Sequence, residues 1–248
     1  MRRIADRTLG TLFGLGTHVL FACTVWSLFW FLKGGRSSPA HPDGLWLDVL
    51  LAGQFALWHS GLLLPSVRRR LGAYVRDAFY GCLFCTVTCA SLLLVFAGWE
   101  PGPVLFRLEG GAATAIQGMF YLSWVALFYS LSLTGLGYQT GWTPWWAWFR
   151  GRKLPPRRFQ PRGAYRWMRH PVYLSFLGLL WFTPVYTLDR LLLNLVWTAY
   201  IFVGSWLKDR RLLFYLGSTY REYLARVPGY PLLGWGPLGR IPREAPWG

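Results

Sequence analysis

Long runs of apolar residues, uncharged except for Asp48 in the second run, dominate the chain and alternate with short basic segments. A helix that crosses the hydrocarbon core of a bilayer needs ~20 mostly apolar residues. Six runs reach or approach that length: residues 9–32, 45–64, 78–99, 112–136, 171–188 and 191–207. The pattern predicts an all-α, polytopic membrane bundle with about six spans, forming a single integral membrane domain over 1–248. Its expected parts are four spans in 1–136, a loop, hairpin and helix in 137–230, and a tail in 231–248.

The C-terminal part of this pattern predicts three further features. The last two runs are separated only by Asp189 and Arg190, which predicts a tight helical hairpin whose first arm Pro184 kinks or ends. Apolar residues then recur at helical spacing from 209 to 227 with arginines among them. This predicts an amphipathic interfacial helix. The Pro- and Gly-rich stretch 228–248 is expected to be a loosely packed cap.

Composition and charge favour the membrane interpretation over the soluble ones. Charged residues make up 15% of the chain and apolar residues 54%, whereas a soluble domain carries roughly 25% charged residues. Of the 26 Lys and Arg, 22 lie in alternate segments that include both termini and the two long basic loops. This asymmetry predicts that both termini are cytoplasmic. Nucleic acid is not expected as a partner, because the basic residues flank apolar runs and there meet membrane lipids.

Two histidines lie within predicted spans, where ionisable groups are costly and often functional. His59 follows Gln54 by about one and a half helical turns. It is either an acceptor-pocket residue acting as a base or a partner in interhelical hydrogen bonds. His18, near the middle of the first run, is interpreted as structural.

Clusters of cysteine and tryptophan each allow a functional and a packing interpretation. Cys82, Cys85 and Cys89 share one helix face and include a CxxC pair. Packing is favoured over a redox or metal site, because no second Cys pair or His cluster completes a ligand set; no metal is expected. The second cluster is interpreted as an interfacial aromatic belt rather than a cation cage: Trp142, Trp145, Trp146 and Trp148.

A basic block at residues 161–173 leads into the fifth apolar run. Pro171 is placed to open a helix, since the missing proline N–H is unpaired at a first helical turn anyway. Free backbone N–H groups there, together with Arg166, Arg169 and His170, predict an anion site at the cytoplasmic interface. On the residues alone, its ligand is a lipid phosphate, a carboxylate or a cofactor.

Two blocks resemble the signature of the membrane methyltransferases related to isoprenylcysteine carboxyl methyltransferase and phospholipid N-methyltransferase. They are Gly163-x-Tyr165-Arg166-x-x-Arg169-His170-Pro171-x-Tyr173 and Gly217-x-x-Tyr220-x-x-Tyr223-x-x-x-Val227-Pro228. The resemblance covers roughly residues 46–230 and is greatest to the methanethiol S-methyltransferase branch. It implies S-adenosylmethionine as cofactor, bound in a pocket open to the cytosol, and a small thiol or lipidic acceptor that arrives from the membrane.

The resemblance also implies roles for individual residues. The cofactor pocket would be lined by Tyr165, Arg166, Arg169, His170, Pro171 and Tyr173, with Asp209, Tyr220 and Tyr223 completing it. Because a thiolate is the nucleophile, a base must take the thiol proton, and His59 and His170 are the candidates. The chain departs from the family where an acidic pair is usual, since Lys208 precedes Asp209.

Three hypotheses remain open at this stage. The first is a membrane thiol methyltransferase acting on methanethiol. The second is the same scaffold with a prenylcysteine carboxylate or a phospholipid amine as acceptor. The third, motivated by Lys208, is a catalytically silent membrane subunit of the same fold.

Overall fold

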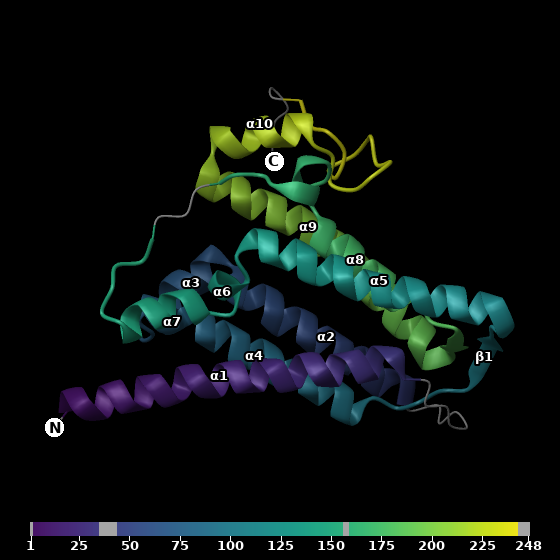
Figure 1. Ribbon diagram of the computed structural model, residues 1–248, viewed down its shortest axis with the longest axis horizontal. Coiled ribbons are helices and arrows are strands. Elements are labelled where there is room, and N and C mark those ends of the chain that lie inside the picture. The colour runs from purple at the N-terminus through teal and green to yellow at the C-terminus, as the bar shows by residue number, and fades with distance from the viewer. Residues whose placement is uncertain (1, 35–43, 156–158, 243–248) are drawn as a thin grey trace. The chain divides into compact units, whose positions relative to one another are not determined.

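The computed structural model describes residues 2–34, 44–155 and 159–242, with side chains from residue 7 onward, and is built almost entirely of helices (Figure 1). The helices are α1 (Arg2–Lys33), α2 (Gly44–Leu63), α3 (Pro65–Leu71), α4 (Asp77–Gly98), α5 (Gly110–Thr134), α6 (Leu136–Gln139), α7 (Trp142–Phe149), α8 (Pro171–Trp181), α9 (Leu188–Leu216) and α10 (Ser218–Arg226). A 3-10 turn spans Gly163–Arg166, and strands β1 (Val104–Arg107) and β2 (Val185–Thr187) pair in a small sheet.

The chain forms two compact units, and each is described by itself. The first contains α1 to α4, α6, α7, the small sheet and the first turns of α9; within it, α4 packs against α1, α2 and α7. The second contains α5, α8, the remainder of α9, α10 and the tail; within it, α5 packs against α8. The candidate site lies entirely in the second unit.

Apolar helices of membrane-crossing length confirm the predicted all-α membrane class. Among the residues that the structure describes, four helices qualify, α1, α4, α5 and α9, and a fifth span results if α2 and α3, bent by 72° at their junction, cross together. Helix α8 has 11 residues, or about 16 Å at 1.5 Å per residue, which is short of a ~30 Å hydrocarbon core. The sixth span therefore stays a prediction.

The predicted turn at Asp189 and Arg190 is wrong, because both residues lie in the first turn of α9. The first arm ends earlier, at Trp181, and Pro184 lies in the connection to β2. Asp189 accepts hydrogen bonds from Trp99 Nε1 (3.0 Å) and from the Gly102 backbone N–H (2.7 Å). A carboxylate in a first turn also interacts favourably with the helix dipole, so the charge begins the helix instead of marking a loop.

The predicted amphipathic helix over 209–227 is wrong at its start. Helix α9 continues through Lys208 and Asp209 to Leu216, and the separate helix α10 begins at Ser218. The break occurs at Gly217, whose φ of +53° is a conformation that glycine adopts most readily. Asp209 is thereby placed on the last turns of a long apolar helix, where it is fully buried.

A glycine pair lets α4 approach the start of α7 closely. Gly141, which precedes α7, has a φ of +83°, and a Cβ added to it would overlap the backbone of Gly81 and Cys82 on α4.

Gly141→Ala is therefore expected to destabilise the first unit. Backbone strain of this kind costs ~1–3 kcal/mol even before the overlap is relieved, so the thermal midpoint of the detergent-purified protein should fall. Gly53→Ala is the matched control, since a Cβ there meets nothing within 4 Å. Equal midpoints for the two variants would contradict the close packing of α4 and α7.

Candidate functional site

The basic block forms a turn before α8, and the backbone of this turn is hydrogen-bonded to the C-terminal tail. Pro171 is the first residue of α8, as predicted, and His170 precedes it. The backbone N–H groups of Arg169 and His170 donate to the carbonyls of Pro228 (2.9 Å) and Gly229 (3.1 Å). The two blocks that carry the family resemblance therefore meet in space, one at the start of α8 and the other at the end of α10.

Asp209 contacts side chains from both of these blocks. Its Oδ2 accepts from Arg169 Nε (3.0 Å), lies 3.0 Å from Arg169 Nη2 and lies 3.0 Å from His170 Nε2. Its Oδ1 accepts from the Tyr220 hydroxyl (2.5 Å). A carboxylate offers about four lone-pair positions, so these donors saturate it. Asp209 fixes three side chains from two different segments, the turn before α8 and helix α10, and has little capacity left for a ligand.

Arg169 is likewise committed to the protein. Besides its contacts with Asp209, its Nη1 donates to the carbonyls of Val227 (2.6 Å) and Gly239 (2.8 Å), and its Nη2 makes a long contact of 3.5 Å with the carbonyl of Pro237. These contacts account for the five N–H donors of a guanidinium. The fully buried Arg169 thus ties the tail to α9, and its direct contact with a cofactor stays a prediction.

Two tyrosines attach α10 to the basic block. Tyr220 donates to Asp209, and the Tyr223 hydroxyl donates to the Tyr165 carbonyl (2.5 Å). The ring of Phe159 packs edge-on against both tyrosine rings, with centroids 5.4 and 5.3 Å away. Burial and the charge of Asp209 raise the pKa of Tyr220, so its hydroxyl stays protonated and can donate. The spacing of these two tyrosines in the sequence is what places both on the buried face of α10.

The hydrogen bonds of Asp209 determine the tautomer of His170. An ionised carboxylate can only accept, so His170 Nε2 must carry the proton that it donates. Burial lowers the pKa of His170, and the hydrogen bond to Asp209 opposes that shift without cancelling it. The neutral imidazole leaves Nδ1 as an acceptor, and this buried atom has no hydrogen-bond partner among the described residues.

The lowered pKa of His170 predicts how stability depends on pH. The unfolded chain takes up this proton first as the pH falls, so His170 stabilises the fold above about pH 6.5 and that contribution is lost below it. We expect the thermal midpoint to fall between pH 6.5 and pH 5, with a smaller fall in His170→Gln. Parallel pH profiles for the two proteins would contradict the assignment of a neutral, buried imidazole.

Lys208 precedes Asp209 on α9 but is not among the side chains that contact the Asp209 carboxylate in the described ranges. Its Nζ is 5.1 Å from the ring centroid of Tyr173 and 5.9 Å from that of Tyr165. Tyr173 also stacks on His170, with ring centroids 5.5 Å apart. The side chain of Lys208 is half-buried. This residue, which departs from the pattern that the resemblance implies, is next to three of the predicted site residues, Tyr165, Tyr173 and Asp209.

The remaining predicted residues differ in where they lie. Pro171 is buried at the start of α8, whereas Arg166 is exposed at the end of the 3-10 turn. His59 belongs to the first unit, on α2, where its ring lies 5.5 Å from that of Phe55 and 5.2 Å from that of Phe84. Its role toward an acceptor stays a prediction.

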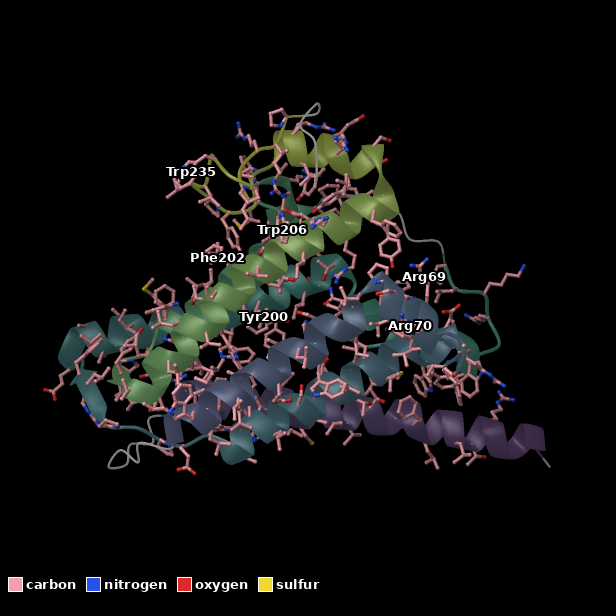
Figure 2. All side chains as sticks on the ribbon, turned by 180° about the vertical axis from the view of Figure 1, so that it is seen from behind. Arg69, Arg70, Tyr200, Phe202, Trp206 and Trp235 are labelled. Carbon is pink, nitrogen blue, oxygen red and sulfur yellow. The ribbon has the colours of Figure 1, made fainter. Side chains whose placement is uncertain are left out.

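Sequence reasoning missed the contribution of the tail. The prediction of a loosely packed cap is wrong for the two ends of the described tail, because Gly229 N–H donates to the carbonyl of Leu238 (2.7 Å) and Ile241 N–H to that of Leu224 (3.2 Å). The Tyr230 hydroxyl is 2.5 Å from Ser205 Oγ on α9, and its ring lies 5.3 Å from that of Phe202. Figure 2 shows Phe202 and Trp206 along α9 and Trp235 on the tail.

The aromatic and cysteine clusters lie in the first unit. Trp145 is buried, its Nε1 donates to the Gly10 carbonyl (2.9 Å), and its ring lies 5.9 Å from that of His18. This gives His18 and the tryptophans a packing role between α1 and α7. Cys85 and Cys89 have their sulfurs 4.0 Å apart, and the cysteines of the described ranges are free thiols. Across residues 2–34, 44–155 and 159–242, no group of three or more His, Cys, Asp and Glu converges.

Comparisons with known proteins give a consistent family. No protein-family model matches the chain, and no solved structure matches it significantly. Methanethiol S-methyltransferase 2 of Bradyrhizobium diazoefficiens is 30% identical, over 75% of this chain and 72% of the relative. Methanethiol S-methyltransferase of Mycobacterium tuberculosis is 29% identical, over 76% and 78%. Nurim of Sus scrofa is 29% identical, over 72% and 70%.

These relatives confirm the resemblance inferred from the two sequence blocks. The matches span about three quarters of the chain, and the helical bundle is of the class that the resemblance implies. The chain therefore belongs to the methanethiol S-methyltransferase family of multi-pass membrane proteins.

Proposed function

We propose that this protein is an S-adenosylmethionine-dependent membrane methyltransferase that methylates a small thiol, with methanethiol as the acceptor. The observation that carries the proposal is the joining of the two family blocks through Asp209, in a chain 30% identical to a methanethiol S-methyltransferase over 75% of its length. Relatives from several organisms carry the same name.

The residues present suit a donor that is polar at one end and carries an adenosyl group. His170 Nδ1 is a buried acceptor with no partner in the described part of the chain, and Lys208 presents an ammonium beside two tyrosine rings. When bound, S-adenosylmethionine supplies a methyl group on a sulfonium, which an acceptor sulfur takes by in-line displacement. Tyr165, His170, Tyr173 and Lys208 would hold it.

The chain contributes alignment and proton removal to this reaction. Alignment of two reactants can lower an activation barrier by ~7–11 kcal/mol. Here the hydrogen bonds of Asp209 keep the His170 ring and Tyr220 in fixed positions. A thiol reacts as its thiolate, so a neutral imidazole has to accept the thiol proton. We assign this role to His59, or to His170 if its Nδ1 atom does not accept a hydrogen bond from the donor. We also place both termini and the donor site on the cytoplasmic side, because the basic segments favour that orientation.

Methyl transfer in membranes tests the proposal. Vesicles containing the protein are incubated with methyl-labelled donor and, separately, with methanethiol, a prenylcysteine or phosphatidylethanolamine. We expect label in dimethyl sulfide. Arg226→Gln, which removes an exposed ion pair with Glu222 on α10, is the control that should keep full activity. A methylated lipid or prenylcysteine as the sole product would replace the thiol assignment with one of the other acceptors.

A catalytically silent subunit is the alternative, which the departure at Lys208 raises. This residue stands where the resemblance implies a carboxylate, and one matched relative, Nurim, has a name that states no reaction. Binding of S-adenosylhomocysteine without any methyl transfer to the three acceptors would support this alternative.

A further inference from the structure

Lys208 is a cation next to Asp209 that has no carboxylate partner among the described residues. The single negative charge of Asp209 is matched by Arg169, which contacts it through Nε and Nη2. Lys208, the preceding residue on α9, forms no ion pair with a carboxylate in the described ranges. Its ammonium instead lies over the rings of Tyr173 and Tyr165, 5.1 and 5.9 Å from the centroids.

The surroundings of Lys208 increase the positive potential at this point. Arg211 follows by three residues and so lies on the same side of α9. Tyr173 is the third residue of α8, so the ammonium lies close to a helix N-terminus, whose dipole also favours negative charge. Removing an ammonium from water without pairing it is costly. The half-buried ammonium of Lys208 is best explained by an anionic ligand that binds beside it and balances its charge.

The adjacent imidazole narrows the choice of ligand. His170 Nδ1 is a fully buried acceptor without a partner among the residues that the structure describes, and its ring stacks on the same Tyr173 that lies beneath Lys208. An acceptor next to a cation complements a group that carries both an ammonium and a carboxylate. The amino-acid end of S-adenosylmethionine has this arrangement, and its carboxylate is the one anionic group of that molecule.

We propose that Lys208 binds the carboxylate of the methyl donor, so that an ammonium in this chain anchors the donor at a position where the resemblance implies an acidic residue. This inference rests on the proposed function and goes beyond it by assigning the end of the donor that Lys208 recognises. Lys208 is thus a binding residue for the donor, and its presence accords with an active enzyme.

Two ligands that differ by one group test this assignment. The first is S-adenosylhomocysteine, and the second is its analogue with the carboxylate replaced by hydrogen. Calorimetry on the purified full-length protein gives the affinity of each for wild type, Lys208→Met and Lys208→Arg. A hydrogen bond to a charged group typically changes affinity by about 10- to 100-fold. We expect wild type to prefer the carboxylate-bearing ligand by that factor and Lys208→Met to lose the preference, while Lys208→Arg retains most of it.

A neighbouring basic residue provides the matched control. Arg210 is exposed on α9, with its guanidinium over the Trp206 ring at 4.9 Å, so Arg210→Met removes a charge from the same helix and should keep the preference. An unchanged preference in Lys208→Met overturns the assignment. Tighter binding of both ligands by Lys208→Met overturns it too, because it would mean that the Lys208 side chain occupies the space of the donor in wild type. If wild type binds neither ligand, the proposed function fails as well; if it binds both equally, the proposed function survives and the role of Lys208 does not.

Discussion

Asp209→Asn is expected to destabilise the second unit by ~3–5 kcal/mol, because it leaves the buried guanidinium of Arg169 without its anion. The amide also puts two N–H donors where the carboxylate only accepted, so the contacts with His170 and Tyr220 cannot all be kept. The loss is measured as a lower midpoint in thermal unfolding of the detergent-purified protein. Donor binding should fall with it, since Asp209 fixes His170.

Two further variants separate this effect from a general loss of charge. Glu222→Gln breaks the exposed pair with Arg226 on α10, and exposed pairs contribute ~0–1 kcal/mol, so its midpoint should stay near that of wild type. The double variant Arg169→Met, Asp209→Leu removes both buried charges and should recover part of the loss. A midpoint for Asp209→Asn equal to that of Glu222→Gln would show that the ion pair does not organise the fold.

His170→Ala is expected to weaken binding of S-adenosylhomocysteine by about 10- to 100-fold and to reduce methyl transfer at least as much. The substitution removes the Nδ1 acceptor and one of the donors to Asp209, and an unmade hydrogen bond in a buried site costs ~1–3 kcal/mol. Calorimetry gives the affinity, and a thermal midpoint recorded on the same sample shows that the protein is folded.

The glutamine variant distinguishes the two tasks of His170. In His170→Gln the side-chain amide can still donate to Asp209, but the imidazole acceptor is lost. We expect stability to recover and affinity to remain low. Recovery of both would mean that His170 acts only by holding Asp209, and wild-type affinity in His170→Ala would remove His170 from the donor site altogether.

Part of this architecture is predictable from local sequence. The position of Pro171 at a helix start follows from the chemistry of proline, and the spacing of Tyr220 and Tyr223 places both on one face of a helix. Local sequence cannot indicate which charged side chains have hydrogen-bond partners in the protein interior. Asp189 and Arg190 look like a loop, yet Trp99 Nε1 donates to the first and Leu32 O accepts from the second at 2.7 Å, so α9 runs through both.

The tail illustrates the same limit. Carbonyl groups within a helix are already bonded along that helix, so a buried guanidinium must find acceptors at helix ends and in irregular segments. Arg169 finds them in Val227 and Gly239, 58 and 70 residues further along the chain. Nothing in the composition of the Pro- and Gly-rich stretch indicates this pairing, which depends on the position of Asp209 on α9.

A structure of the protein with S-adenosylhomocysteine bound would test the location of the donor site most directly. We predict ligand density in the second unit, with the homocysteine carboxylate within hydrogen-bond distance of Lys208 Nζ and the amino group facing His170 Nδ1. Density that lies away from the Arg169-His170-Pro171 turn, or a protein that stays unliganded at millimolar concentration, would contradict the assignment of this cluster as the place where the methyl donor binds.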